Sequence, residues 1–265
     1  MKAARRTGAC AAALCVALYG RDAGATGEVG RVVTDTAAGN YRVAAQTDAS
    51  RFSLSNAGGF RFTTALRADW SPRPGLALRV RVPYHFMSLD DGARFDGWGD
   101  AELRIKTRIF GISDYVLVQA GVIETLPTGS KRDRLGNGAM VLTPFVTAGR
   151  RFGETILYAY VSDAIALRRE NALAYEDLTD PSTDHEARSA VGAMLAIKQR
   201  VQANVSMSAI TILGGRDVGQ TFVHGGPIVG VLLSEDARLV LGGQVPVAGD
   251  RRFDWRTTAD LYFSF

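Results

Sequence analysis

Ionisable side chains occupy every second position from 100 to 108, and this row is the part of the chain best suited to hold a charged solute. It reads Asp100, Glu102, Arg104, Lys106 and Arg108, and it alternates with Ala101, Leu103, Ile105 and Thr107. Successive side chains of a β-strand point to opposite faces, so the charges share one face and the apolar residues the other. The pattern predicts a face that attracts or pairs ions and does no covalent chemistry.

Two neighbouring stretches carry charges on one face in the same way. Their members are Arg61, Arg67, Asp69, Arg79 and Arg81. The three stretches together hold seven basic and three acidic side chains on that face. Such an excess favours a path for anionic solutes. The alternative is that the charges pair across a closed space and fill it, with Glu124 and Asp163 as further partners.

Twelve β-rich segments are expected to position this face, each about as long as the 9–11 residues that cross a bilayer at a tilt. They are expected at 41–55, 60–70, 76–84, 100–109, 115–125, 139–150, 155–166, 187–198, 201–211, 221–232, 237–247 and 253–265. The last one alternates strictly, with aromatic residues at both ends of its apolar face and charges on the other face. Aromatic residues that flank an apolar band are typical of a transmembrane β-strand.

Connections between these segments alternate between short and long. Short ones are expected at 71–75, 111–114, 151–154, 199–200 and 233–236, and longer ones at 85–98, 126–138, 167–186 and 212–220, with a smaller one at 248–252. Outer-membrane barrels have short periplasmic turns and longer external loops, which directs the last strand toward the periplasm. An even strand count then requires the segment 41–55, although its own alternation is weak.

The first 25 residues have the features of a removable signal peptide. Lys2, Arg5 and Arg6 precede an apolar run, and Ala23-Gly24-Ala25 offers a cleavage site, which leaves a barrel over residues 26–265. Both cysteines lie inside the segment, so the mature chain is expected to have no disulfide and no thiolate metal site. The segment also carries three of the four net positive charges. A nucleic-acid partner therefore has no support.

A soluble lipocalin-like barrel is the alternative fold, because it alternates as well, but with its apolar face inward. The amount of charge on one face, the signal peptide and the terminal Phe265 together favour a membrane barrel. An Arg at the lipid midplane costs about 2–4 kcal/mol, so the charged face is expected to line the lumen. Twelve strands enclose a space between that of a filled small barrel and a porin channel.

Several motifs between residues 97 and 138 follow one another in a characteristic order. They are Gly97-Trp98-Gly99-Asp100, Leu126-Pro127-Thr128-Gly129-Ser130 and Leu135-Gly136-Asn137-Gly138. In this order they resemble a family of outer-membrane barrels associated with the meta-pathway of phenol degradation and described as transporters. The resemblance covers about residues 97–150 by motif and implies a barrel in the outer membrane of a Gram-negative bacterium. A terminal Phe, here Phe265, resembles the residue by which the barrel-assembly machinery recognises its substrates.

A lipid hydrolase is a function of a different class that a twelve-stranded barrel can serve. Such an enzyme needs a histidine beside a serine near the outer membrane edge. His85, His185 and His224 are the histidines of the chain, and none lies in a Gly-x-Ser-x-Gly motif. We therefore expect no enzyme activity. We also expect no cofactor and no metal site, although Asp177, Asp180, Asp184 and Glu186 could bind a divalent cation in the external loop.

The sequence thus predicts an all-β protein, an antiparallel up-and-down transmembrane barrel of about twelve strands. Its expected partners are outer-membrane lipid, the assembly machinery and an unidentified small solute. The expected function is passive transport, with a structural or surface-binding barrel without a pore as the alternative.

Overall fold

The computed structural model describes residues 41–53, 58–112, 116–129, 135–136, 138–169, 184–197, 200–215 and 217–265. The signal peptide expected at 1–25 lies outside these residues. The described residues form no helix long and apolar enough to cross a membrane. They form strands, which are β1 (Tyr41–Ser53), β2 (Gly58–Arg73), β3 (Leu76–Leu89), β4 (Arg94–Trp98), β5 (Ala101–Ile112), β6 (Val116–Leu126), β7 (Ala139–Phe152), β8 (Thr155–Arg169), β9 (His185–Ile197), β10 (Val201–Gly214), β11 (Thr221–Leu232), β12 (Ala237–Gly249) and β13 (Trp255–Ser264).

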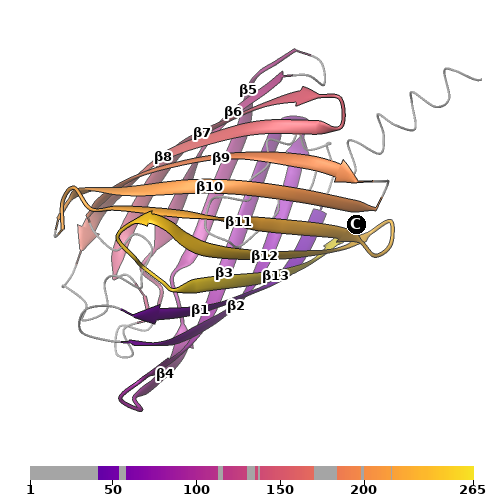
Figure 1. The fold of residues 1–265 in the computed structure, drawn as a ribbon. Helices are drawn as coiled ribbons and strands as arrows, with labels where there is room; N and C mark the ends of the chain where they lie inside the picture. The colour runs from indigo at the N-terminus through magenta and orange to yellow at the C-terminus, as the bar shows by residue number, and fades with distance from the viewer. Residues whose placement is uncertain are drawn as a thin grey trace, which may run out of the picture.

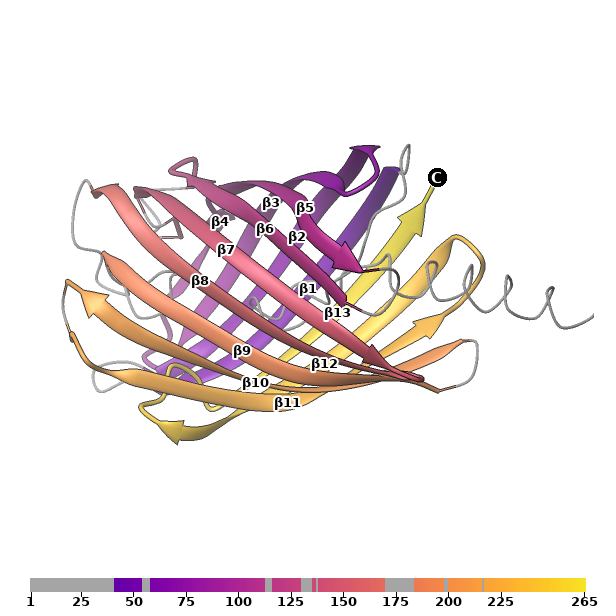
Figure 2. The ribbon, with the colours of Figure 1, turned by 90° about the horizontal axis from the view of Figure 1, so that it is seen from above.

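Antiparallel pairing of each strand with its neighbours closes the sheet into a barrel (Figure 1). The closing seam joins β1 to β13 in a register that runs from Arg42 opposite Ser264 to Arg51 opposite Trp255. Figure 2 shows these two strands side by side where the first and last parts of the chain meet. The strands β4 and β5 both pair with β3 and form two parts of one wall strand. The barrel wall therefore has twelve strands, which confirms the predicted fold class.

The interruption between β4 and β5 lies at the Gly-Asp pair of the first motif. The amide of Gly99 donates to the carbonyl of Pro83 over 2.9 Å, and Pro83 has no N–H to continue the ladder. The buried Asp100 accepts a hydrogen bond of 2.8 Å from the amide of Gly129. The motif residues thus tie the connection after β6 to the break in the wall strand.

The prediction of a long loop at 85–98 is wrong. The strand β3 continues to Leu89, and Arg94–Trp98 returns as β4, so the connection is only four residues long. The register places His85 opposite Gly97 and Ser88 opposite Arg94. The segment 94–98 lacks an alternating apolar pattern, but it still pairs with β3 through its backbone. Its charged side chains are tolerated because they can reach water.

Alternating burial separates an inner and an outer face on most of the long strands, most regularly on β1 and β10. On β1 the burial changes at each residue, with Arg42 and Gln46 buried and Val43 exposed. On β10 Gln202 and Asn204 are buried, whereas Val205 is 64% exposed. Polar side chains thus fill the inside, and the exposed outer face is mainly aliphatic and aromatic. This arrangement is that of a membrane barrel and excludes the lipocalin-like alternative.

Aromatic side chains gather near both edges of the outer face around the seam. Tyr41 stacks on Trp70 with ring centres 6.2 Å apart, and Phe60 packs against Trp255 at 6.0 Å. Arg51 on β1 lies opposite Trp255 and therefore marks the level of the second aromatic pair. Tyr41 and Arg51 are ten residues apart on β1. With a rise of about 3.4 Å per residue and a tilt of about 40°, this separation is about 26 Å, close to the apolar band of an outer-membrane barrel.

Both termini of the barrel lie at the edge that carries the short turns. The amide of Phe265 donates to the carbonyl of Tyr41 over 2.9 Å, so the last residue is joined to the first strand. The turns at 74–75 and 153–154 lie at this same edge, and Gly75 and Gly153 have φ angles of +78° and +61° that favour glycine. We refer to this edge as the periplasmic edge and to the opposite one as the external edge.

Candidate functional site

The predicted charge row lies on the inner face of β2, β3 and β5. Arg67, Arg104 and Lys106 are each at most 4% exposed. Arg79, Arg81 and Glu102 are half-buried, and Arg108 is exposed near the periplasmic end of β5. Arg61 and Asp100 share the same face in the external half of the barrel. The structure therefore brings these residues together on one wall of the lumen, as the alternation predicts.

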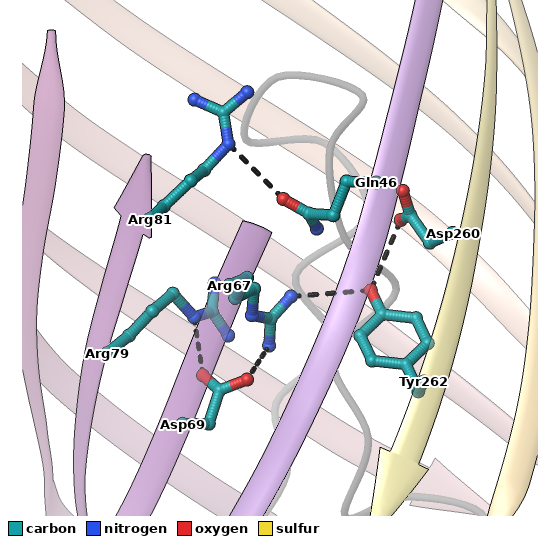
Figure 3. A network of polar contacts seen from close by, with 7 residues as sticks. All are labelled: Gln46, Arg67, Asp69, Arg79, Arg81, Asp260 and Tyr262. Carbon is teal, nitrogen blue, oxygen red and sulfur yellow. Dashed lines mark hydrogen bonds and ion pairs between the residues drawn. The ribbon is translucent and has the colours of Figure 1, made fainter. Parts of the chain in front are cut away.

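One carboxylate joins two of the guanidinium groups on this wall (Figure 3). Asp69 Oδ2 lies 2.7 Å from Arg67 Nη2, and its Oδ1 lies 2.6 Å from Arg79 Nε. A single carboxylate thus bridges two guanidinium groups from the adjacent strands β2 and β3. The side chains are also held in fixed positions, since charge-assisted hydrogen bonds are short and directional.

Arg81 extends the network to the adjacent strand β5 and, past β2, to β1. Its Nη1 lies 2.7 Å from Glu102 on β5, and its Nε donates to Gln46 on β1 over 3.2 Å. Gln46 is an inward residue of the strand whose sequence alternation is weakest. The sequence analysis did not single it out, although its even position, shared with Arg42 and Asp48, places it on the inner face.

Aromatic rings support the basic wall farther along the lumen. The guanidinium of Arg104 lies 4.5 Å from the ring centre of Phe145, within the range of a cation–π contact. Phe145 in turn stacks on Tyr160 with ring centres 5.8 Å apart. A Cβ on Gly121 would meet the Phe145 ring, so the missing side chain lets this ring lie flat against the wall.

The opposite wall is mainly polar, and its charged side chains include Glu186 and Arg188 on β9 and Arg238 on β12. Tyr158 on β8 and Asn204 on β10 are hydrogen-bonded, with Asn204 Nδ2 donating to the hydroxyl over 3.0 Å. Gln202 accepts a hydrogen bond from Arg238, whose side chain is 1% exposed. The space between these groups and Ile228 does not admit a water molecule. This sector of the lumen is packed.

Two carboxylates expected as partners of the basic wall face outward. Glu124 pairs with Leu103 and Leu142, which belong to the outer face, so it cannot reach the lumen. Asp163 Oδ1 lies within hydrogen-bond distance, 2.7 Å, of His185 Nε2 on the outer face of β8 and β9. The expectation that they complete the lumen network is wrong. The sequence contains a signal for this, because Glu124 is two positions from Val122 and from Leu126 and therefore shares their outer face.

The other two histidines lie on the inner face. His85 is within 2.8 Å of the Thr63 hydroxyl, and Arg61 lies 3.4 Å from the same ring nitrogen. His224 stacks on Phe253 with ring centres 4.4 Å apart. No group of three or more metal-ligating side chains occurs in the described part of the chain.

Known structures share this architecture. The chain resembles the COG4313 outer membrane channel from Pseudomonas putida F1 with a TM-score of 0.69 and 13% identity, over 85% of this chain and 94% of that one. It resembles the KdgM porin with a TM-score of 0.54 and 6% identity, over 84% and 99% of the two chains. No protein-family model and no curated protein matches the chain.

At these identities the likeness establishes the fold. Together with the apolar outer surface and the closed sheet, it defines an outer-membrane β-barrel, and this confirms the predicted location in a bacterial outer membrane.

Proposed function

We propose that this barrel is a passive channel for small solutes in which the basic wall favours anions. The observation that carries the proposal is the charge balance on the inner face of β2, β3 and β5. Seven basic and three acidic side chains share that face, an excess of four basic groups on these three strands. A charged wall with low-dielectric surroundings concentrates ions of the opposite sign.

Conductance of the refolded protein in a planar bilayer tests the channel. We expect steps of conductance in KCl for the wild type. Neutralising Arg79, Arg81, Arg104 and Arg108 to Gln should reduce the chloride preference. If the folded protein produces no conductance and the variant changes nothing, the proposal is wrong.

A structural or surface-binding barrel without a pore is the second candidate. It is favoured by the low solvent exposure of inner side chains on all sides of the lumen. Those at most 4% exposed include Gln46, Arg104, Tyr160, Asn204 and Asp260. Side chains that line a wide water-filled channel are more accessible. This candidate predicts that the folded protein passes no ions under any of the conditions above.

Membership of the family associated with phenol degradation remains part of the proposal. It rests on the motifs between 97 and 138 and on the COG4313 channel as a relative in fold. The hydrogen bond from the Gly129 amide to Asp100 joins two of these motifs in this chain.

A further inference from the structure

The turn between β12 and β13 folds into the external mouth of the barrel. Its first residues, Asp250 and Arg251, are exposed, as expected for a hairpin turn. The next residue, Arg252, is 8% exposed and points inward. A long charged side chain in a surface turn normally keeps its head in water. The burial of Arg252 therefore requires a specific partner.

That partner is Glu186 at the external end of β9. Glu186 is fully buried and accepts hydrogen bonds from Arg252 and, over 2.9 Å, from Arg188. The strands β10 and β11 lie between β9 and β12, so the contact with Arg252 passes over two strands. The guanidinium of Arg252 also lies 4.6 Å from the ring centre of Phe222 on β11.

The following residue, Phe253, extends the turn toward the other side of the mouth. Its ring stacks on His224 of β11 at 4.4 Å and also packs against an apolar cluster of β1, β3 and the connection after β6. The members of this cluster are Phe52, Met87, Leu89 and Leu135. The turn thus contacts strands from β9 through the seam to β3.

The far end of the turn is fixed to β1. The Asp254 amide donates to the carbonyl of Arg51 over 2.7 Å, and the Ser53 hydroxyl donates to the Asp254 carboxylate over 2.7 Å. At the near end, Gly249 has a φ of +74° and lies so close to the Thr221 carbonyl that a Cβ would collide with it. Arg252 lies between these two anchored ends.

We infer that residues 250–254 form a strap across the external mouth, that the ion pair of Arg252 with Glu186 holds it closed, and that its release admits the solute. A buried ion pair contributes little net stability compared with apolar residues of similar size, but it becomes unfavourable as soon as one partner is lost. Removing either charge therefore favours movement of Arg252 and the exposed residues before it toward water, while Phe253 and Asp254 keep their contacts. The inference rests on the proposed channel function.

Planar-bilayer recordings of three variants in KCl test the strap. Glu186→Gln and Arg252→Gln each remove one charge of the pair and keep the side-chain length or shape similar. Arg251→Gln is the matched control, because this neighbouring arginine is exposed. Only samples that show the heat-modifiable band of a folded barrel on electrophoresis are recorded. If Glu186→Gln does not fold, Arg252→Gln still tests the inference, because its substitution lies in the turn.

We expect each variant of the pair to raise the mean conductance at least about threefold, and the double variant to add little more, since the two changes disrupt one interaction. Arg251→Gln should conduct like the wild type. If folded Arg252→Gln and Glu186→Gln conduct like the wild type, the inference that the strap closes the mouth is wrong, and the proposed channel function is unaffected. If no folded sample conducts, both the strap and the channel are wrong.

Discussion

Arg67 and Tyr262 join the second strand to the last strand across the closing seam of the barrel. The guanidinium carbon of Arg67 lies 5.2 Å from the Tyr262 ring centre, and its Nη1 donates to the hydroxyl over 3.3 Å (Figure 3). The hydroxyl in turn donates to Asp260 over 3.1 Å. The seam is thus held by inner side chains as well as by the backbone ladder between β1 and β13.

Removing the Tyr262 hydroxyl should weaken the seam. In Tyr262→Phe the ring stays, but the hydrogen bonds with Arg67 and Asp260 are lost, and bonds to charged groups contribute about 1.5–3 kcal/mol. We expect the free energy of unfolding to fall by about 2 kcal/mol in urea titrations of the refolded protein. Tyr84→Phe is the matched control, because its bond to Asp96 is exposed and should cost less than about 1 kcal/mol. Equal losses in the two variants would contradict the role of the seam network.

Asp69 should matter for both stability and ion selectivity. Asp69→Asn leaves Arg67 and Arg79 without their shared counter-charge, so we expect the free energy of unfolding to fall by about 3 kcal/mol. The chloride preference in bilayer recordings should rise, because the wall gains a net positive charge.

The exposed pair of Asp90 with Arg51 provides the control for Asp69. Asp90→Asn should change stability by less than about 1 kcal/mol, as is usual for surface ion pairs. An Asp69→Asn variant as stable and as selective as the wild type would show that the carboxylate does not set the charge of this wall.

The sequence predicts the strands and their faces well because alternation is a local property. The row Asp100 to Arg108 and the closing strand needed only the period of two. The strand at 41–53 followed from the parity of the strand count, although its own pattern is weak. These arguments were enough to predict the inner positions of Arg67, Arg104 and Lys106.

Contacts between strands that are not neighbours could not be predicted in this way. The contact of Arg67 with Tyr262 spans 195 positions, and that of Arg252 with Glu186 spans 66. Both depend on the stagger of the strands around the barrel, which local periodicity does not contain. The strand Arg94–Trp98 was missed for a different reason, since its charged residues and glycine hide the pairing with β3.

Gly192 should be sensitive to the smallest substitution. A Cβ at this position would collide with the ring of Tyr158, which lies against the glycine and bonds Asn204. We expect Gly192→Ala to lower the free energy of unfolding by about 1–3 kcal/mol, as overpacking does. Tyr158→Leu in the same chain should recover part of the loss. Gly243→Ala, where nothing lies within 4 Å, is the control and should fold like the wild type.

Neighbouring positions of β10 should differ in how strongly the same arginine substitution destabilises them. Val205 is 64% exposed on the outer face, whereas Ser206 faces the lumen. Val205→Arg should reduce the free energy of folding into lipid by about 2–4 kcal/mol, with a smaller effect of Ser206→Arg. Refolding titrations into vesicles measure the difference. A larger loss for Ser206→Arg would mean that the two faces are assigned the wrong way round.

The reversal potential of the refolded protein in a KCl gradient tests the central claim most directly. The excess of basic side chains on β2, β3 and β5 predicts a reversal potential displaced toward the chloride equilibrium potential. Replacing Arg79, Arg81, Arg104 and Arg108 by Gln should move it toward zero. A potential displaced toward the potassium value in the wild type, or left unchanged by the four substitutions, would contradict the account.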